Sequence, residues 1–233
     1  MRPFALVLLA ACAGATSTST STSTSTSGAE EPLVDRRHGH RHGHPHDFGD
    51  VERFEAIFDA PDRDEWQRPG ELVALMALEP GATVVDLGAG TGYFLRYLAG
   101  AVGPEGKVLA LDTEPAMVEH MRARVAREGL SNVEVRAVAP DDPGLAPASV
   151  DAVLVVDTWH HIANRRRYAA RLKSALRPGG ALWIVDFTED APDGPPPEMR
   201  LAPEQVLAEL TDAGLQAEIL DEELPRQYVI RAR

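Results

Sequence analysis

A run of glycines that joins an apolar segment to an amphipathic one constrains the fold of this chain more than any other feature. It reads VVDLGAGTGYF at residues 84–94. Residues 83–87 combine β-branched and apolar side chains, which indicates a buried strand, whereas residues 93–102 have apolar side chains at helical spacing. A strand that leads through glycines into a helix is the context in which Rossmann-type sheets bind nucleotides. The segment therefore predicts a parallel sheet with a ligand crevice at this turn.

Strand and helix signals alternate along the chain on both sides of this turn. Short apolar runs predict further strands at residues 107–111, 133–138, 150–156, 181–187, 215–220 and 227–230. Helical spacing predicts helices over residues 51–58, 72–78, 115–127, 165–176 and 204–213, with a turn-rich connection at 61–69. This alternation predicts an α/β fold with a Rossmann-like, mostly parallel seven-stranded sheet, an antiparallel edge hairpin and helices on both faces.

The spacing of the glycines narrows the class of nucleotide. The dinucleotide fingerprint G-x-G-x-x-G would place its third glycine at Tyr93, and no Lys-Ser/Thr pair follows as in a phosphate-binding P-loop. Asp86 with Gly88, Gly90 and Gly92 instead resembles motif I of the class I S-adenosylmethionine-dependent methyltransferases. The resemblance covers roughly residues 70–190 and implies S-adenosyl-L-methionine as the cofactor.

The resemblance also implies roles for individual residues in cofactor binding. Glycines in the loop let the backbone approach the ligand and adopt positive φ angles. Asp86 is expected to orient the methionine amino end, directly or through water. Asp112 ends the next predicted strand, where a carboxylate accepts hydrogen bonds from the ribose hydroxyls.

Two further cofactor contacts follow from the same resemblance. The family usually has an acid after the third strand that contacts the adenine amino group; Asp141 or Asp142 would do this here, or the backbone amide of Ala139. N-terminal helices of the family often lie across the cofactor as a lid. Gln67 is therefore expected to hydrogen-bond the cofactor, and Trp66 either stacks on the ligand or packs as a buried tryptophan.

Candidate catalytic residues follow the fourth predicted strand, in DAVLVVDTWHHIAN at residues 151–164. Because strand ends at this edge face the ligand crevice, Asp157 and His160 are expected near the methyl group that is transferred. Methyl transfer needs a base only if the acceptor is protonated, and an imidazole can take that proton near neutral pH. We predict His160 as the base, with Asp157 orienting it or binding the acceptor. The alternative is that one of the two histidines, His160 or His161, packs beneath the following helix; we expect His160 to face the crevice.

Composition limits the acceptor and the partners. The chain has a net charge of −13 and its acidic residues are concentrated in residues 47–233, which argues against nucleic acid as the substrate. A small-molecule methyl acceptor is therefore expected. The single cysteine, Cys12, excludes an internal disulfide, a thiolate metal site and chemistry that needs paired thiols, such as arsenite methylation. We expect no metal in the catalytic domain and, since nothing specifies an oligomer, a monomer.

The N-terminal segments are expected to lie outside the catalytic domain. Residues 1–12, MRPFALVLLAAC, resemble a bacterial lipoprotein leader with a lipid anchor on Cys12; the alternatives are a misassigned start or an apolar N-terminus that contains cysteine. Residues 13–46 form a linker, with Thr-Ser alternation that serves as a tether, a glycosylated stalk or a spacer. Its HGHRHGHPH stretch at 38–46 is expected to bind divalent metal only weakly, as a solvated segment rather than a dedicated site.

Two functions from different classes fit these observations. The first is an S-adenosylmethionine-dependent methyltransferase of residues 47–233, favoured because all residues of motif I are present. The second is a non-catalytic, methyltransferase-like lipoprotein that binds a ligand or metal. A functional leader predicts a membrane-anchored lipoprotein, and a non-functional one predicts a cytoplasmic enzyme.

Overall fold

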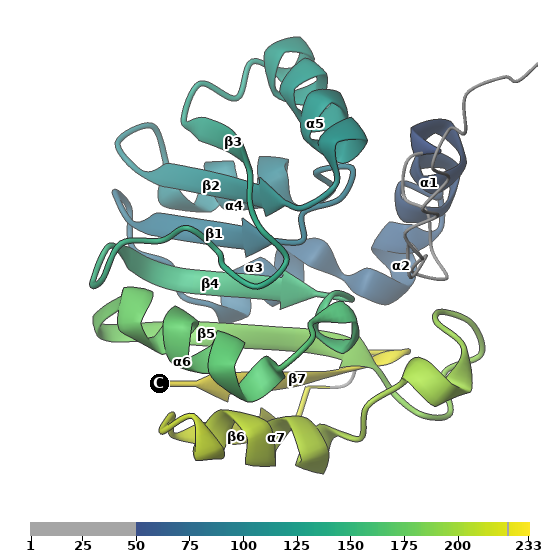
Figure 1. The fold of residues 1–233 in the computed structure, drawn as a ribbon. Helices are drawn as coiled ribbons and strands as arrows, with labels where there is room; N and C mark the ends of the chain where they lie inside the picture. The colour runs from purple at the N-terminus through teal and green to yellow at the C-terminus, as the bar shows by residue number, and fades with distance from the viewer. Residues whose placement is uncertain (1–49, 223) are drawn as a thin grey trace, which may run out of the picture. The chain divides into compact units, whose positions relative to one another are not determined.

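The computed structural model describes residues 50–222 and 224–233, which form a seven-stranded sheet flanked by helices (Figure 1). The strands are β1 (Thr83–Leu87), β2 (Lys107–Asp112), β3 (Val133–Ala137), β4 (Val150–Val156), β5 (Leu176–Phe187), β6 (Ala217–Leu220) and β7 (Gln227–Ala232). The helices are α1 (Val51–Phe58), α2 (Arg63–Gln67), α3 (Pro69–Leu75), α4 (Leu95–Val102), α5 (Pro115–Glu128), α6 (Arg165–Ala175) and α7 (Pro203–Asp212). None of these helices is long and apolar enough to span a membrane. The predictions for residues 1–46 lie outside the described residues.

The strand order is β3-β2-β1-β4-β5-β7-β6. Strands β1 to β5 pair in parallel, and β7 is antiparallel to both of its neighbours, β5 and β6. This confirms the predicted fold, including the antiparallel pair at the edge. The strand order reverses between β1 and β4, and ligands of open α/β sheets bind beyond the carboxyl ends of strands at such a switch point. In Figure 1 these ends point to the right.

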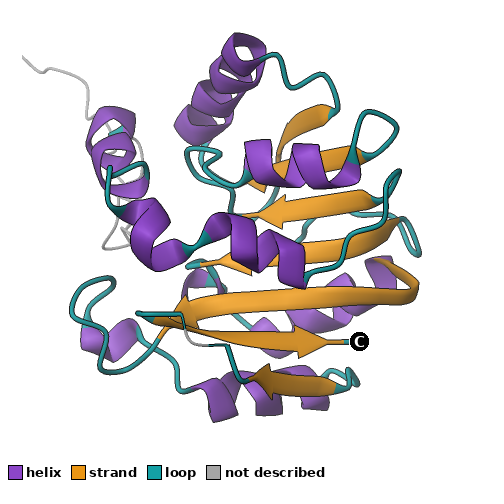
Figure 2. Cartoon of the chain, turned by 180° about the vertical axis from the view of Figure 1, so that it is seen from behind, coloured by secondary structure: helices purple, strands orange, loops and turns teal. Residues whose placement is uncertain are grey.

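Alternate side chains of the strands pack against helices on opposite faces of the sheet. Val84 belongs to one apolar cluster, with Leu95 of α4 and Met121 of α5. Its neighbour Val85 belongs to the other cluster, with Leu172 of α6. Figure 2 shows α3 and α4 in front of the first face, and Figure 1 shows α6 and α7 in front of the second. Both faces are thus covered, so the open edges at the strand ends are where a ligand can enter.

The main departure from the sequence prediction is helix α2, which forms in the segment 61–69 that was predicted as turns. It ends at Gln67; the next residue, Arg68, has a φ angle of +48°, and Pro69 then begins α3 earlier than the predicted residue 72. Helix α2 has only five residues, and the two that are buried, Arg63 and Gln67, are polar. Apolar periodicity therefore gave no signal for it. Its polar inner face lies beside the switch point.

Candidate functional site

The glycine loop and the exit of β4 are in direct contact. Gly88 has a φ angle of +72°, and a Cβ atom at this position would lie 2.3 Å from Cγ2 of Thr158. The hydroxyl of Thr158 lies 3.3 Å from the carbonyl oxygen of Gly88 and 2.9 Å from that of Val156. Only glycine permits this approach. The predicted cofactor loop and the predicted acceptor strand therefore form one site.

Asp112 lies at the tip of the glycine loop, as the strand-end argument predicts. Its Oδ2 accepts a hydrogen bond of 2.8 Å from the backbone N–H of Gly90, and its Oδ1 accepts one of 2.9 Å from Glu114. Burial raises the pKa of the Asp112 carboxyl, and these backbone donors oppose the rise. The carboxylate is thus held rigidly beside the loop.

Asp86 is buried within β1, at the base of the same loop. Burial and the nearby charge of Asp112 raise its pKa to about 7, while the guanidinium of Arg63 opposes the shift. The side chain is poised between its neutral and ionised forms near physiological pH. A cationic partner would favour the ionised form.

Helices α1 and α2 lie at the carboxyl edge, over the glycine loop (Figure 1). A Cβ atom at Gly90 would lie 3.6 Å from the ring of Phe58 in α1. Asp59 accepts a hydrogen bond of 2.8 Å from Arg124 of α5, which also donates to the carbonyl oxygen of Thr91 at 3.1 Å. The segment predicted from family resemblance as a lid is therefore anchored to the loop itself.

Arg63 of α2 places a buried guanidinium at this site, which the sequence analysis did not identify. It donates hydrogen bonds to the carbonyl oxygen of Phe58 and, at 3.2 Å, to Oε1 of Gln67, and its Cζ lies 4.0 Å from the ring centroid of Tyr93. Its Nε has no hydrogen-bond partner although it is buried. An unpaired buried donor costs about 1–3 kcal/mol. This is a place where a hydrogen-bond acceptor on a ligand would be stabilised.

Gln67 joins Arg63 to the strand end of β4 through Gln227. Its Nε2 donates to Oε1 of Gln227 at 2.6 Å, and Nε2 of Gln227 donates to Oδ1 of Asp157 at 2.6 Å. Both amide side chains are buried. The predicted contact between Gln67 and a cofactor stays a prediction, and the structure adds Gln227 to the site.

Asp157 follows β4 with a φ angle of +50°, in the left-handed region that is costly for a residue other than glycine. Besides Gln227, it faces Arg63, whose Nη2 lies 3.9 Å from its Oδ2. Burial and the charge of Asp186 raise the pKa of Asp157 to about 7; Arg63, Gln227 and His160 oppose the rise. The structure thus turns Asp157 toward α2 and β7.

The carboxylate that contacts His160 is Asp186, near the end of β5. Nδ1 of His160 lies 2.9 and 3.0 Å from the two carboxylate oxygens of Asp186. Of the two roles left open for Asp157, orienting the imidazole therefore falls to Asp186. The ring of His161 packs against that of His160, with centroids 4.2 Å apart, and His161 is the exposed member of the pair. A carboxylate near the end of the fifth predicted strand was the available signal for Asp186.

The two acids proposed for adenine binding follow β3. Both Asp141 and Asp142 are exposed. Asp142 forms an ion pair of 2.6 Å with Arg171 of α6, and its Oδ1 accepts a hydrogen bond from the backbone of Gly144 at 2.9 Å. Ala139 and Asp142 pair through an isolated bridge. The loop therefore has a defined shape beyond Asp112, with Asp142 held toward α6.

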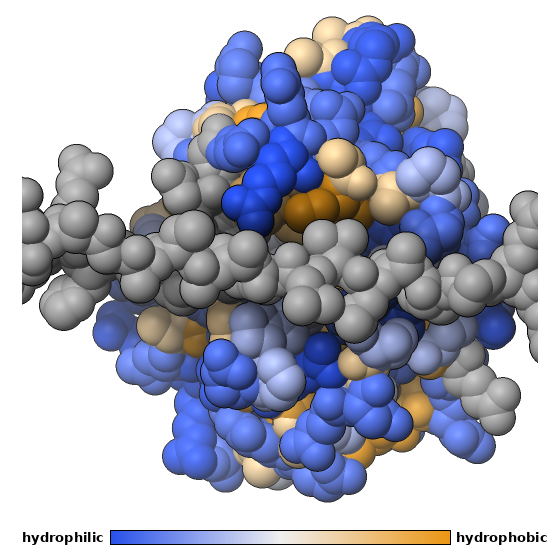
Figure 3. Space-filling view, turned by 90° about the vertical axis from the view of Figure 1, so that its right-hand side faces the viewer, coloured by the Kyte–Doolittle hydropathy of each residue, from blue (hydrophilic) through white to orange (hydrophobic). Residues whose placement is uncertain are grey.

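Trp66 of α2 lies against Phe187, the last residue of β5, and against Arg226. The ring centroids of Trp66 and Phe187 are 5.9 Å apart. Cζ of Arg226 lies 4.7 Å from the ring centroid of Trp66. Arg226 in turn makes two hydrogen bonds of 2.9 Å to Asp193. Figure 3 views this edge, where a small hydrophobic patch lies among hydrophilic side chains. Trp66 is half-buried, so part of its ring remains accessible for contact with a ligand.

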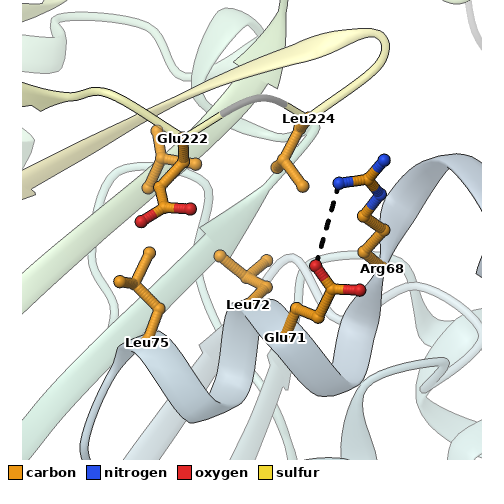
Figure 4. Close-up of a pocket in the computed structure, with 7 residues that line it drawn as sticks. Arg68, Glu71, Leu72, Leu75, Glu222 and Leu224 are labelled. Carbon is orange, nitrogen blue, oxygen red and sulfur yellow. Dashed lines mark ion pairs between the residues drawn. The ribbon is translucent and has the colours of Figure 1, made fainter.

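A separate small cleft lies away from these residues, between α3 and the connection from β6 to β7 (Figure 4). Leu72 of α3 faces Leu224 across it and Leu75 faces Glu222, and Arg68 and Glu71 form an ion pair of 3.8 Å at its side. It contains none of the predicted site residues. The carboxyl edge is therefore the candidate site.

Acidic side chains gather at the carboxyl edge. Arg63 favours the ionised forms of Asp86 and Asp157, but burial still raises the pKa of both carboxyls to about 7, while Asp186 lies against the imidazole of His160. Buried charges are stable when they are paired, so this arrangement favours a cationic ligand. Within the described part of the chain, no three or more His, Cys, Asp or Glu side chains are grouped to hold a metal ion.

Comparisons with known proteins agree with this geometry. Residues 84–180 match a family model described as a methyltransferase domain. The crystal structure of a SAM-dependent methyltransferase from Aquifex aeolicus is 30% identical, with a TM-score of 0.74, and the match covers 80% of this chain and 98% of that one.

Two curated relatives match over shorter regions. The arsenite methyltransferase of Halobacterium salinarum is 34% identical over 123 residues, covering 53% of this chain and 32% of that protein. The nocamycin O-methyltransferase of Saccharothrix syringae is 32% identical over 151 residues, covering 64% and 51%. The chain thus spans about a third to a half of the length of these relatives.

Proposed function

Because the chain belongs to the S-adenosylmethionine-dependent methyltransferases, we propose that it transfers a methyl group to a small molecule held beside Asp157 and His160. The observation that carries the proposal is the contact between Gly88 and Thr158. It joins the loop that marks the cofactor site to the strand end that carries the candidate catalytic residues. The alternative of a non-catalytic binding protein is less well supported, since every residue of motif I is present.

The residues at the edge fit the cofactor. Bound S-adenosylmethionine supplies an electrophilic methyl group on a positively charged sulfur. The unpartnered Nε of Arg63 suits its carboxylate, and the buried Asp86 suits its amino group. Asp112 would bind the ribose hydroxyls. Asp141 is the better placed of the two acids for adenine, because Asp142 is ion-paired with Arg171.

His160 and Asp186 can move a proton at this edge. An ionised carboxylate only accepts hydrogen bonds, so Asp186 fixes the proton of the neutral imidazole on Nδ1. Nε2 is then the nitrogen that can accept a proton from the acceptor. We therefore propose an acceptor that loses a proton on methylation, such as a hydroxyl or a protonated amine. Trp66 and Phe187 would hold its apolar part.

The identity of the relatives does not fix the acceptor. Arsenite is the substrate in the name of one relative, but this sequence has a single cysteine at Cys12, so it lacks the paired thiols that we associate with that reaction. The O-methyltransferase relative is compatible with a hydroxyl acceptor. The acid-rich edge disfavours nucleic acid.

Calorimetric titration of the full chain with S-adenosylmethionine and S-adenosylhomocysteine tests the cofactor assignment. We expect both to bind, and an absence of binding at millimolar concentration would contradict the proposal. A labelled methyl donor can then be used to screen phenols, alcohols, amines and carboxylic acids. Transfer to any of these separates an enzyme from a binding protein.

A further inference from the structure

Four side chains, of which that of Asp157 is 21% exposed, form a continuous chain of hydrogen bonds from helix α2 to the end of β4. Arg63 donates to Gln67 at 3.2 Å, Gln67 donates to Gln227 at 2.6 Å, and Gln227 donates to Asp157 at 2.6 Å. The exposed fractions are 8% for Arg63, 0% for Gln67 and 2% for Gln227. Three elements that are distant in sequence are thus joined through amide groups that have no access to water.

The groups at the two ends of this series of hydrogen bonds determine which atom donates in each bond. A guanidinium has only donors, so the atom of Gln67 that faces Arg63 must be its oxygen. The Gln67 nitrogen then faces the Gln227 oxygen, and the Gln227 nitrogen faces Asp157. An ionised carboxylate accepts this last bond without rearrangement, whereas a protonated one offers fewer acceptor sites. The hydrogen bond from Gln227 therefore favours the ionised form of Asp157.

Few other groups favour that ionised form. Nη2 of Arg63 lies 3.9 Å from Oδ2 of Asp157. The charges of Arg63 and His160 both lower the pKa of Asp157. Burial and Asp186 act in the opposite sense, and the hydroxyl of Tyr228 also lies within electrostatic range. The position is backbone-strained as well, with a φ of +50°. The amide of Gln227 is the short, direct hydrogen bond that holds Asp157 in place.

We propose that Gln227 is a positioning residue that transmits the docking of helix α2 to Asp157. When α2 packs over the glycine loop, Gln67 orients the Gln227 amide, which favours the ionised form of Asp157 and holds its side chain toward α2 and β7. A ligand that binds Arg63 thereby affects the position and the ionisation of Asp157 through these hydrogen bonds. The consequence for the reaction rests on the proposed function, but the connection between Gln67 and Asp157 does not.

The test uses the full-length protein, four variants and a fifth variant for the NMR assignment. Gln227→Met and Gln67→Met each remove the amide with little change in length, and the double variant removes both. Val229→Ala is the matched control, because Val229 is fully buried on the same strand and has no polar group in the chain of bonds. The primary readout is the pH titration of the Asp157 carboxyl by carbon-13 NMR, assigned with Asp157→Asn.

We expect Gln227→Met to raise the titration midpoint of Asp157 by about one pH unit, and Gln67→Met to raise it less. The double variant should match Gln227→Met, because Gln67 acts only through Gln227. Val229→Ala should lower the melting temperature and leave the midpoint unchanged. An unchanged midpoint in Gln227→Met, or additive effects of the two single variants, would overturn the proposal.

A second readout concerns the reaction site. S-adenosylmethionine carries a charge on sulfur that S-adenosylhomocysteine lacks. We expect Gln227→Met to weaken the former by about fivefold at pH 7 and the latter by less, because a one-unit rise from a pKa of about 7 lowers the ionised fraction of Asp157 about fivefold at that pH. If the affinities for both compounds fall equally, the hydrogen bonds from Gln67 through Gln227 to Asp157 do not act on the charged sulfur. If the wild-type protein binds neither compound, the proposed function fails, whereas the NMR titration still decides whether these hydrogen bonds act on Asp157.

Discussion

Nδ1 of His160 lies 2.9 Å from Oδ1 of Asp186, and the two side chains are 3% and 1% exposed. The pair comes from the exit of β4 and the end of β5, which are neighbours in the sheet. A buried carboxylate that fixes the tautomer of an imidazole is the arrangement that a general base requires.

We expect His160→Ala to lower turnover by about 10²–10⁴-fold for an acceptor that must lose a proton. Cofactor affinity should hardly change. Asp186→Asn should lower turnover in the same direction, because an amide can donate to Nδ1 and so favours the wrong tautomer. Turnover and calorimetric affinity measured side by side check this. Lost cofactor affinity with normal turnover at saturation would reassign His160 to the binding pocket, and a small effect on both would indicate an acceptor that needs no base.

Replacement of Arg63 should act on cofactor binding. Arg63→Met is expected to weaken S-adenosylhomocysteine binding by about tenfold or more, since hydrogen bonds to a charged group are worth about 1.5–3 kcal/mol. Arg63→Lys should recover part of the loss, because it keeps the charge without the planar fork. Arg96→Met is the control: Arg96 also contacts α2, through Asp64, but from an exposed position. Equal effects of Arg63→Met and Arg96→Met would show that only docking of α2 matters.

Asp112→Ala should weaken binding of both cofactor forms. Loss of two hydrogen bonds from ribose hydroxyls to a charged acceptor is expected to cost about 1.5–3 kcal/mol each. Asp142 lies in the loop after β3, and Asp142→Ala removes its ion pair with Arg171 of α6. This variant should have little effect on cofactor affinity. Calorimetry on both variants is the measurement, and unchanged affinity in Asp112→Ala would remove this residue from the site.

Stability of the protein without ligand should fall as pH rises from about 4 to about 7. Asp86 and Asp157 have pKa values of about 7 in the folded protein, above the ordinary value near 4. Between these values the folded state binds more protons than the unfolded state, so stability decreases with pH and levels off above 7. Thermal melts across this range, with Asp86→Asn and Asp157→Asn, test the assignment. A flat profile in the wild-type protein would contradict it.

Cofactor affinity should change with pH in the opposite sense. Ionised carboxylates attract a cation, so S-adenosylmethionine should bind more tightly as pH rises through 7 and should release protons on binding. S-adenosylhomocysteine, with a neutral sulfur, should show a smaller dependence. Calorimetry in buffers of different ionisation enthalpy counts the protons. Proton uptake instead of release would exclude this account.

The N-terminal segments should be dispensable for folding of the domain. Deletion of residues 1–46 is expected to leave the melting temperature nearly unchanged in metal-free buffer, because their glycines, proline and polar residues offer no core to join. The full chain in the same buffer is the reference. A large loss of stability would show that this region packs against the domain.

Much of the fold could be predicted because strand signals are local. The predicted limits of residues 83–87 and 150–156 agree with β1 and β4. Helix α2 was missed because its inward side chains are polar, so the hydrophobic pattern carried no trace of it. Helix α3 was placed late because Pro69, at its first turn, was taken as part of the turn before it.

The position of a site residue could be predicted where that residue is itself the end of a predicted strand. Asp112 was found beside the glycine loop as expected, because one strand end positions it. Asp186 was treated as part of a buried strand, since nothing local shows that it meets His160. Gln227 was missed for the same reason: its partners come from α2 and β4, and only the folded sheet brings them together.

Strand β7 follows β6 in the sequence but lies between β5 and β6 in the sheet. On the ribosome, the edge of β5 must therefore wait, unpaired, while α7 and β6 are made. An exposed strand edge is a template for pairing with other chains, so the unpaired edge of β5 exposes the nascent protein to aggregation until β7 pairs with it. Strand β7 also delivers Gln227 to Asp157. Protection of the edge of β5 and completion of the polar network at Asp157 thus depend on the same strand.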